Sequence, residues 1–284
     1  MDKNKIIIGS ANFSLKYGLV NNFKNIRIKE IKKIFKSCKK NNLKFIDTAK
    51  GYGDSEKIIG NQIKNNWNII TKIPKINLEK KIDIEIMIND LINDSLKKLK
   101  VKKLYAILLH DEDQLLQKNC NYVFEVLNNL KKKKITKKIG VSFYSPKKLI
   151  KVISKFDLDI AQVPINYINR SFLNKKLIKK LKDKKMEIHA RSIFLQGLLL
   201  NKKLKIKKFK KLIDFLDLWH KKKKLNHLES SINFITSQKC IDKYVIGFQN
   251  LKQINEILKT KKVKISNFPR YNNDYLKDPR KWID

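Results

Sequence analysis

The sequence has few cysteines, few residues that break secondary structure and no long apolar run. Its three cysteines, Cys38, Cys120 and Cys240, are odd in number and far apart, a spacing that indicates neither a disulfide framework nor a metal site. With 8 glycines and 5 prolines, no flexible linker divides the chain, which predicts one domain over residues 1–284. No run approaches the roughly 20 apolar residues that span a bilayer, and the first apolar run is too short for a signal peptide. We therefore expect a cytoplasmic location and no membrane partner.

Arginine is also scarce, although the formal net charge is +40. The 66 basic residues include only five arginines, which are Arg27, Arg170, Arg191, Arg270 and Arg280. Arginine is the side chain that grips phosphate with two hydrogen bonds and reads bases, so its scarcity argues against a dedicated nucleic-acid surface. No aromatic residues are interleaved with the lysines as a base-stacking platform would require. The charge predicts weak, salt-dependent binding of polyanions and no specific nucleic-acid partner.

Short apolar runs alternate with longer amphipathic segments along the whole chain. The runs are Ile6–Ile8, Phe45–Ile46, Ile69–Ile70, Tyr105–Leu109, Lys138–Val141, Ile160–Val163, Glu187–Ala190 and Tyr244–Ile246. Eight strands alternating with helices predict an α/β fold, a (β/α)8 TIM barrel. The segment from Lys202 to Lys243 is longer than one helix requires and predicts an extra helix. From about residue 266 the chain reads as an irregular C-terminal extension.

The first polar residues after these runs form an unusual set. They are Asp47, Lys72, His110, Ser142, Gln162 with Asn166, and Arg191. Active sites of such barrels lie at the carboxyl ends of the strands, so these side chains are expected to meet. Tyr52 lies between two glycines on the loop after Asp47. A carboxylate, an ammonium, an imidazole and a phenol together are typical of proton transfer.

A tyrosine phenol is a poor acid near neutral pH, because its reference pKa is about 10. A neighbouring ammonium stabilises the phenolate and lowers that pKa, and a carboxylate can hold the ammonium in place. Tyr52, Lys72 and Asp47 follow adjacent strands and could meet in that order.

At these residues the chain resembles the aldo-keto reductase superfamily. "FIDTAKGYGDSEKIIG" is similar to its aspartate–tyrosine signature, "IITKI" to its lysine strand and "AILLHD" to its histidine strand. "KKIGVSFYSP", "AQVPINYINR", "HARSIFLQGLLL" and "YVIGFQNLKQINEIL" resemble its cofactor-binding segments. The resemblance implies a carbonyl reductase or alcohol dehydrogenase that uses a nicotinamide cofactor without a Rossmann domain. The absence of any G-x-G-x-x-G motif fits that implication.

The resemblance also implies a role for each matching residue. Tyr52 gives the proton to the carbonyl oxygen, Lys72 lowers the pKa of Tyr52, Asp47 pairs with Lys72, and His110 orients the carbonyl. Ser142 and Gln162 hold the nicotinamide carboxamide. The pyrophosphate lies along Arg191, Ser192, Leu195 and Gly197, and the adenosine half is approached by Gly247, Phe248, Gln249, Gln253 and Glu256.

Two departures from the family pattern concern the cofactor. Many relatives have asparagine after the strand-5 serine, where this chain has Phe143. Many NADPH-preferring relatives have an arginine near the position of Gln253, whereas only Lys252 is close here. We nevertheless expect NADP(H) to be favoured over NAD(H), because the positive field of the whole chain attracts the extra phosphate.

Alternatives remain open at this point. His110 could be a core histidine, and Lys75 could replace Lys72 as the site lysine. The protein could be a cofactor-binding regulatory protein on the same barrel. It could also be an unrelated barrel lyase or isomerase, to which four scattered histidines with no paired spacing give little support. The "RSIFLQGLLL" segment is similar to bacterial members associated with sugar metabolism, so a small carbonyl substrate such as a sugar derivative is expected. The sequence does not define the oligomeric state.

Overall fold

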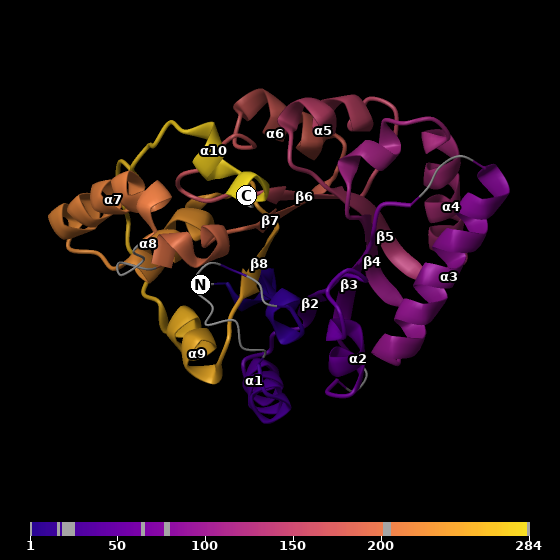
Figure 1. Cartoon of the computed structure of the whole chain (residues 1–284), viewed down its shortest axis with the longest axis horizontal. Helices are drawn as coiled ribbons and strands as arrows, with labels where there is room; N and C mark the ends of the chain where they lie inside the picture. The colour runs from indigo at the N-terminus through magenta and orange to yellow at the C-terminus, as the bar shows by residue number, and fades with distance from the viewer. Residues whose placement is uncertain are drawn as a thin grey trace.

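The strands close into a parallel barrel in which each strand pairs with the next along the chain (Figure 1). This computed structural model describes residues 2–15, 18, 26–63, 66–76, 80–200 and 206–282. The strands are Ile6–Gly9 (β1), Phe45–Asp47 (β2), Asn68–Ile73 (β3), Leu104–Leu109 (β4), Thr136–Ser142 (β5), Ile160–Pro164 (β6), Glu187–Arg191 (β7) and Lys243–Gly247 (β8). The ring closes where Ile6 pairs with Tyr244 and Gly9 with Gly247. The predicted (β/α)8 barrel is confirmed.

Helices surround the strands. They are Ile28–Lys40 (α1), Ser55–Gly60 (α2), Lys81–Leu99 (α3), Cys120–Lys132 (α4), Pro146–Ile153 (α5), Lys175–Asp183 (α6), Lys210–Lys223 (α7), His227–Ser237 (α8), Leu251–Lys259 (α9) and Asp274–Lys277 (α10). Short 3₁₀ turns are Lys3–Lys5 (η1), Ala11–Phe13 (η2), Glu112–Leu115 (η3), Leu195–Leu200 (η4), Lys207–Phe209 (η5) and Pro279–Trp282 (η6). Both α7 and α8 lie between β7 and β8, which confirms the extra helix. In the C-terminal extension, α10 and η6 interrupt an otherwise irregular path.

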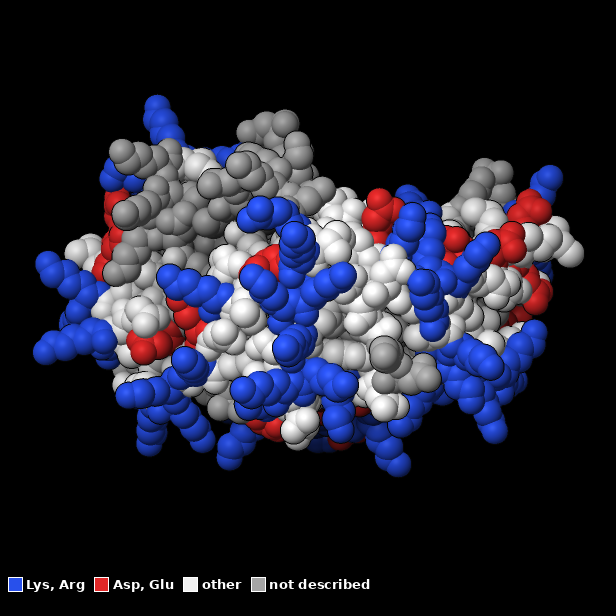
Figure 2. Space-filling view, turned by 90° about the horizontal axis from the view of Figure 1, so that it is seen from below, with Lys and Arg blue, Asp and Glu red and all other residues white. Residues whose placement is uncertain are grey.

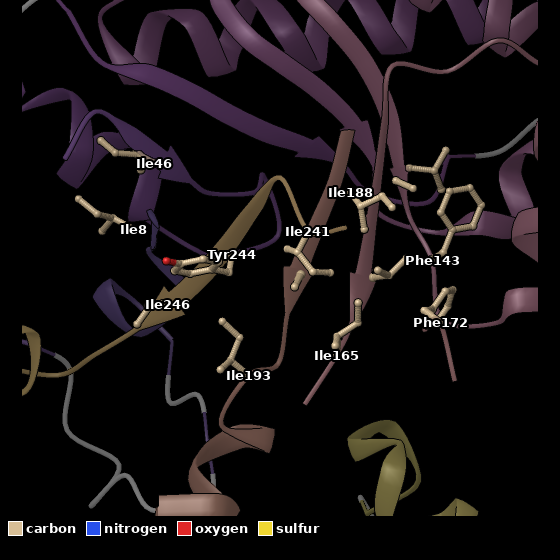
Figure 3. Packing of buried hydrophobic residues seen from close by; sticks show 14 of the residues in the cluster. Ile8, Ile46, Phe143, Ile165, Phe172, Ile188, Ile193, Ile241, Tyr244 and Ile246 are labelled. Atoms are coloured by element: carbon tan, nitrogen blue, oxygen red, sulfur yellow. The ribbon is translucent and has the colours of Figure 1, made fainter. Parts of the chain in front are cut away.

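The outer faces of the strands pack against the helices. Figure 3 shows this packing around Ile46, Ile188 and Tyr244, all of which are buried. In α1 the buried residues are Ile31, Ile34, Phe35 and Cys38. Their spacing of three and four positions places them on one helix face, while the lysines between them stay in solvent.

Inside the barrel a second, smaller apolar cluster is formed by Ile7, Ile70, Ala106, Leu108 and Ile160. Side chains alternate between the two faces of a strand, so the residue two positions later points the same way. Continuing by two from this cluster leads to a polar layer at the carboxyl ends of the strands. Ile70, Leu108 and Ile160 lead in this way to Lys72, His110 and Gln162. Asp47, Ser142 and Arg191, the last residues of β2, β5 and β7, belong to the same layer. The alternation therefore directs the predicted site residues into the barrel mouth.

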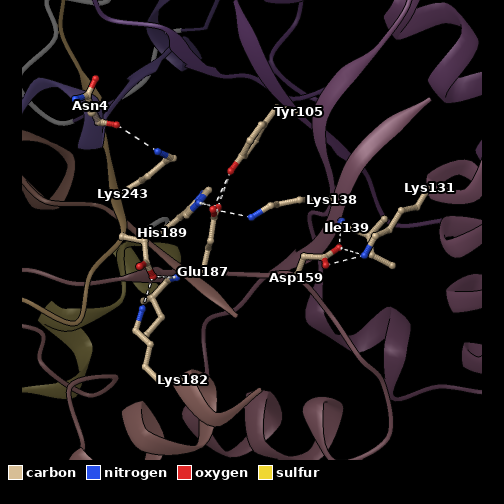
Figure 4. Close-up of polar contacts among 12 residues, drawn as sticks. Asn4, Tyr105, Lys131, Lys138, Ile139, Asp159, Lys182, Glu187, His189 and Lys243 are labelled. Atoms are coloured by element: carbon tan, nitrogen blue, oxygen red, sulfur yellow. Dashed lines mark hydrogen bonds and ion pairs between the residues drawn. The ribbon is translucent and has the colours of Figure 1, made fainter. Parts of the chain in front are cut away.

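The opposite, amino-terminal end of the barrel has its own polar cluster, centred on Glu187 (Figure 4). The Glu187 carboxylate accepts hydrogen bonds from Lys138 Nζ at 2.7 Å and from the Tyr105 hydroxyl at 2.9 Å. His189 Nε2 lies 2.9 Å from the same carboxylate. These contacts tie β4, β5 and β7 together at the end of the barrel that usually serves stability.

Lysines cover the outer surface. Figure 2, which views the molecule from below relative to Figure 1, shows lysine and arginine across this face with few acidic residues between them. The spread is broad and fits charge carried on solvated helix faces. Within the described ranges, no helix combines the length and the apolar character needed to cross a membrane.

The contact between α2 and α3 allows a direct stability test. A Cβ added to Gly60 would collide with the carbonyl oxygen of Lys98 and would lie 2.8 Å from the carbonyl carbon of Leu99, both backbone atoms of α3. Gly60→Ala should therefore lower the free energy of unfolding by about 3 kcal/mol, a typical cost of overpacking. Gly51→Ala is the matched control, since a Cβ there meets nothing within 4 Å. Urea denaturation of both variants measures the difference, and equal stabilities would contradict the close approach.

Candidate active site

A buried ion pair lies at the centre of the barrel mouth. Lys72 Nζ is 2.5 Å from Asp47 Oδ1 and donates a second hydrogen bond to the Thr48 carbonyl oxygen at 2.9 Å. Gln162 Nε2 donates to the other carboxylate oxygen of Asp47 at 2.7 Å. Both charged side chains are almost fully buried. Lys75 is exposed beyond the end of β3, so Lys72 is the lysine that reaches the site.

Tyr52 stands on the loop between β2 and α2, beside this pair. Lys72 Nζ lies 5.0 Å from the centre of its ring, and the His110 ring meets it edge-on at 5.7 Å. The next residue, Gly53, has a φ of +55°, a left-handed conformation that favours glycine and turns the chain into α2. The Ser55 hydroxyl, at the start of α2, donates to the Ser10 carbonyl oxygen at 3.0 Å and ties the loop to β1.

Burial controls the protonation of these groups. It raises the pKa of the Tyr52 phenol above its ordinary value, and the Asp47 carboxylate raises that pKa further. The cation that opposes this rise in the pKa of Tyr52 is Arg191, whereas the sequence predicted that Lys72 would lower that pKa. Burial also lowers the pKa of the Lys72 ammonium, against the pull of Asp47.

His110 is neutral at physiological pH. Burial, with the charges of Lys72 and Arg191, lowers the pKa of its imidazole to about 3. A neutral imidazole carries one N–H, so His110 can donate a hydrogen bond without bringing a charge into the site.

Arg191 is held at the mouth by the loop after β5. Its Nε donates to the Ser142 hydroxyl at 3.2 Å, and its Nη2 donates to the Phe143 carbonyl oxygen at 3.1 Å. The guanidinium lies 3.9 Å from the centre of the Tyr144 ring, and the guanidinium of Arg280, from η6, lies 3.6 Å from the same ring centre. A residue of the C-terminal extension thus shares the Tyr144 ring with Arg191.

A cavity of about 500 Å³ opens beside these groups, within the size range of small-molecule sites. Eleven of the predicted site residues line it, namely Asp47, Tyr52, Gln162, Arg191, Ser192, Gly197, Gly247, Phe248, Gln249, Gln253 and Glu256. Lys72, His110 and Ser142 lie behind that lining, in contact with Asp47, Tyr52 and Arg191 respectively. Leu195 is fully buried, and the neighbouring Gln196 lines the cavity in its place.

The carboxyl end of β1 also lines the cavity, through Gly9, Ser10, Ala11 and Asn12. Sequence reasoning missed this segment, although Ser10 follows its strand in the same way as the other polar residues. A Cβ on Gly9 would lie 3.0 Å from Val245 Cγ1, so glycine keeps this wall close to β8. The Ser10 hydroxyl is buried and has no hydrogen-bond partner among the described residues, so an unsatisfied polar atom lies beside the cavity.

A barrel with a half-buried phenol, a buried ion pair and a neutral imidazole at its carboxyl end is typical of an enzyme that transfers protons. The chain belongs to the aldo/keto reductase family, whose family model matches residues 5–270. The family consists of oxidoreductases that act on small carbonyl compounds and generally use NAD(P)H. The expected family is confirmed.

Solved structures share the fold at low sequence identity. An aldo-keto reductase from Bacillus halodurans (holo form) has a TM-score of 0.71 and 13% identity, with 92% of this chain and 88% of that chain covered. A glycerol dehydrogenase from Gluconobacter oxydans has a TM-score of 0.70 and 17% identity, with 92% of this chain and 88% of that chain covered. A putative aldo-keto reductase from Pseudomonas aeruginosa has a TM-score of 0.68 and 16% identity, with 90% of this chain and 88% of that chain covered. A comparison with curated proteins finds no match.

Proposed function

We propose that this protein is an NAD(P)H-dependent oxidoreductase that reduces an aldehyde or ketone to an alcohol, with Tyr52 as the general acid. The observation that carries the proposal is the position of Tyr52, which lines the cavity and lies beside the buried Asp47–Lys72 pair. The substrate class expected from the sequence is a small carbonyl compound such as a sugar derivative.

Each residue around Tyr52 has a separate role in proton transfer. Because burial raises its pKa, Tyr52 keeps its proton at neutral pH and can deliver it to the carbonyl oxygen as negative charge develops there. His110 donates a hydrogen bond that orients the carbonyl without adding charge. Lys72 and Arg191 stabilise the phenolate that remains, and Asp47 fixes the position of Lys72.

The cavity suits a nicotinamide cofactor, which supplies the hydride for the carbonyl carbon when it is bound. Gln162 uses its amide N–H group on Asp47, so its carbonyl oxygen remains available to accept from a carboxamide. The free Ser10 hydroxyl is a further donor close by. Arg191, Ser192 and the turn around Gly197 would hold the pyrophosphate, and the residues from Gly247 to Glu256 would receive the adenosine half.

Direct cofactor binding tests the proposal. The purified protein should bind NADPH, NADH or both with a dissociation constant in the micromolar range, as is usual for enzymes of this kind. Titration of cofactor fluorescence measures the constant. Binding no tighter than millimolar for both dinucleotides would contradict the proposed function.

Turnover then separates an enzyme from a regulatory protein that only binds cofactor. We expect oxidation of the reduced cofactor with a panel of aldehydes, keto sugars and nucleotide-linked keto sugars, followed at the cofactor absorbance band. Tight cofactor binding without turnover on any member of the panel would favour the regulatory alternative.

A further inference from the structure

The ring of Tyr144, on the loop after β5, lies between two guanidinium groups. The Arg191 guanidinium is 3.9 Å from the ring centre, and the Arg280 guanidinium is 3.6 Å from the same centre. Two guanidinium groups this close to one ring centre would overlap on a single face, so they lie on opposite faces. Each face of an aromatic ring attracts a cation. The ring therefore joins Arg191, which lines the cavity, to Arg280 of the C-terminal extension.

The backbone of Tyr144 is fixed separately from its ring. The Tyr144 N–H donates to Glu112 Oε2 at 2.8 Å, and the Ser145 N–H donates to the same oxygen at 3.2 Å. Glu112 is buried in η3, two residues after His110. These contacts tie the loop after β5 to the loop after β4. The side-chain torsions of Tyr144 are the remaining freedom, and the two guanidinium groups restrict them.

Arg280 meets the ring from an anchored turn. Its Nη2 donates to Asp278 Oδ2 at 2.7 Å and its Nε donates to Asp278 Oδ1 at 3.0 Å, a paired contact that fixes the plane of a guanidinium. Trp282, in the same turn η6, is buried, and its indole N–H donates to the Tyr275 carbonyl oxygen at 3.0 Å. Arg280 is thus a rigid support for one face of Tyr144.

The hydrogen bonds of Arg191 are weaker than those of Arg280. Its Nε, Nη1 and Nη2 donate to the Ser142 hydroxyl, the Ser192 hydroxyl and the Phe143 carbonyl oxygen at 3.2, 3.3 and 3.1 Å. All three distances are at or near the long end of the usual range for N–H donors. Stacking on the Tyr144 ring is therefore needed to hold the guanidinium of Arg191 in one plane.

We propose that Tyr144 and Arg280 are positioning residues for proton transfer. Arg280 fixes the Tyr144 ring, and the ring fixes the Arg191 guanidinium. Arg191 then stays where its charge stabilises the Tyr52 phenolate. This role rests on the proposed function, because it concerns the step that Tyr52 carries out.

Two observations connect Arg191 to Tyr52. Both residues line the same cavity, and Arg191 is the cation that opposes the rise in the pKa of Tyr52. The C-terminal extension therefore influences the acid, although none of its described residues lines the cavity.

Arg280→Ala tests this role, because it frees the Tyr144 ring and, through the ring, Arg191. With saturating cofactor, kcat for the carbonyl compound of the panel that is reduced fastest should fall by about threefold to tenfold, as expected for the loss of a cation–π pair. Oxidation of the corresponding alcohol needs the Tyr52 phenolate. A less stabilised phenolate forms at higher pH, so the rise of the oxidation rate should move to higher pH than in the wild type.

Other variants separate stacking from charge and from folding. Arg280→Lys keeps the charge but loses the planar group that stacks, so it should resemble Arg280→Ala. Tyr144→Leu removes the ring without touching the extension and gives the same test if Arg280→Ala folds poorly. Tyr144→Phe keeps the ring and should retain most of the turnover. Arg270→Ala removes an exposed arginine of the same extension and should change neither the rate nor the pH profile.

Each result bears on a different part of the proposal. Equal kcat and equal pH profiles in Arg280→Ala and the wild type would overturn it while leaving the proposed function intact. A loss of the same size at every pH would also overturn it, because that result indicates a structural role alone. Wild-type behaviour of Arg280→Lys would assign the effect to charge and reject the role of the ring. A wild type that turns over no member of the panel would contradict the proposed function and this role with it.

Discussion

Tyr52→Phe should lower kcat by about a hundredfold or more, the usual loss when general acid catalysis is removed. Phenylalanine keeps the ring beside His110 and Lys72 and deletes only the hydroxyl that supplies the proton. Cofactor affinity should change little, because the ring still packs against the same neighbours. Steady-state kinetics together with a cofactor titration measure both effects.

Tyr144 provides the comparison that makes this test specific. Its ring lies against the guanidinium of Arg191, and Tyr144→Phe keeps that contact while deleting the other phenol near the mouth. A loss of kcat in Tyr144→Phe, with Tyr52→Phe close to wild type, would move the acid role to Tyr144.

The pH dependence should differ between the two directions of the reaction. Burial raises the pKa of Tyr52, so the proton needed for reduction is present at neutral pH and is lost only under alkaline conditions. Alcohol oxidation requires the phenolate to accept a proton, so its rate should rise with pH over the range in which reduction falls. Parallel profiles in both directions would contradict Tyr52 as the titrating group.

Lys72→Met should lower the free energy of unfolding by about 3–5 kcal/mol, the usual cost of removing one partner from a buried ion pair. Asp47 would then remain buried with only the Gln162 amide as a partner, and desolvation of an unpaired carboxylate is costly. Turnover should also fall, since the phenolate of Tyr52 loses a neighbouring cation. Urea denaturation and kcat measure the two effects separately.

Two further variants test this prediction even if Lys72→Met folds poorly. Lys72→Met combined with Asp47→Asn removes both charges and should recover most of the stability, but not the turnover. Lys75→Met removes an exposed ammonium and should change stability by less than about 0.5 kcal/mol. Recovery of turnover in the double variant would give the ion pair a purely structural role.

The strands and the inward direction of the site residues could be predicted because both follow from local pattern. Each apolar run is a strand, and alternation along the strand fixes which side chains face the interior. That alternation is why Asp47, Lys72 and Gln162 meet in the structure as their places in the sequence suggested. The pairing of Lys72 with Asp47 required only that β2 and β3 be neighbours, as consecutive strands of a barrel are.

Features that depend on tertiary contacts or unusual backbone angles could not be predicted from the local sequence pattern. The turn after β7 has left-handed φ values at Leu195 and Gln196, which buries the first and exposes the second to the cavity. Arg191 contacts the loop after β5 and acts on Tyr52, and Arg280 reaches the mouth from the C-terminal extension.

The pairing of β1 with β8 has a consequence for how the chain folds. Ile6 and Tyr244 must find each other across almost the whole sequence, and contacts between distant residues are slow to form. Until they meet, β1 and β8 are open sheet edges that could pair with other molecules. Lys5 directly precedes β1 and Lys243 begins β8, and charged side chains at such positions discourage edge-to-edge association. Lysines at both edges would therefore disfavour pairing with other molecules until β1 and β8 meet.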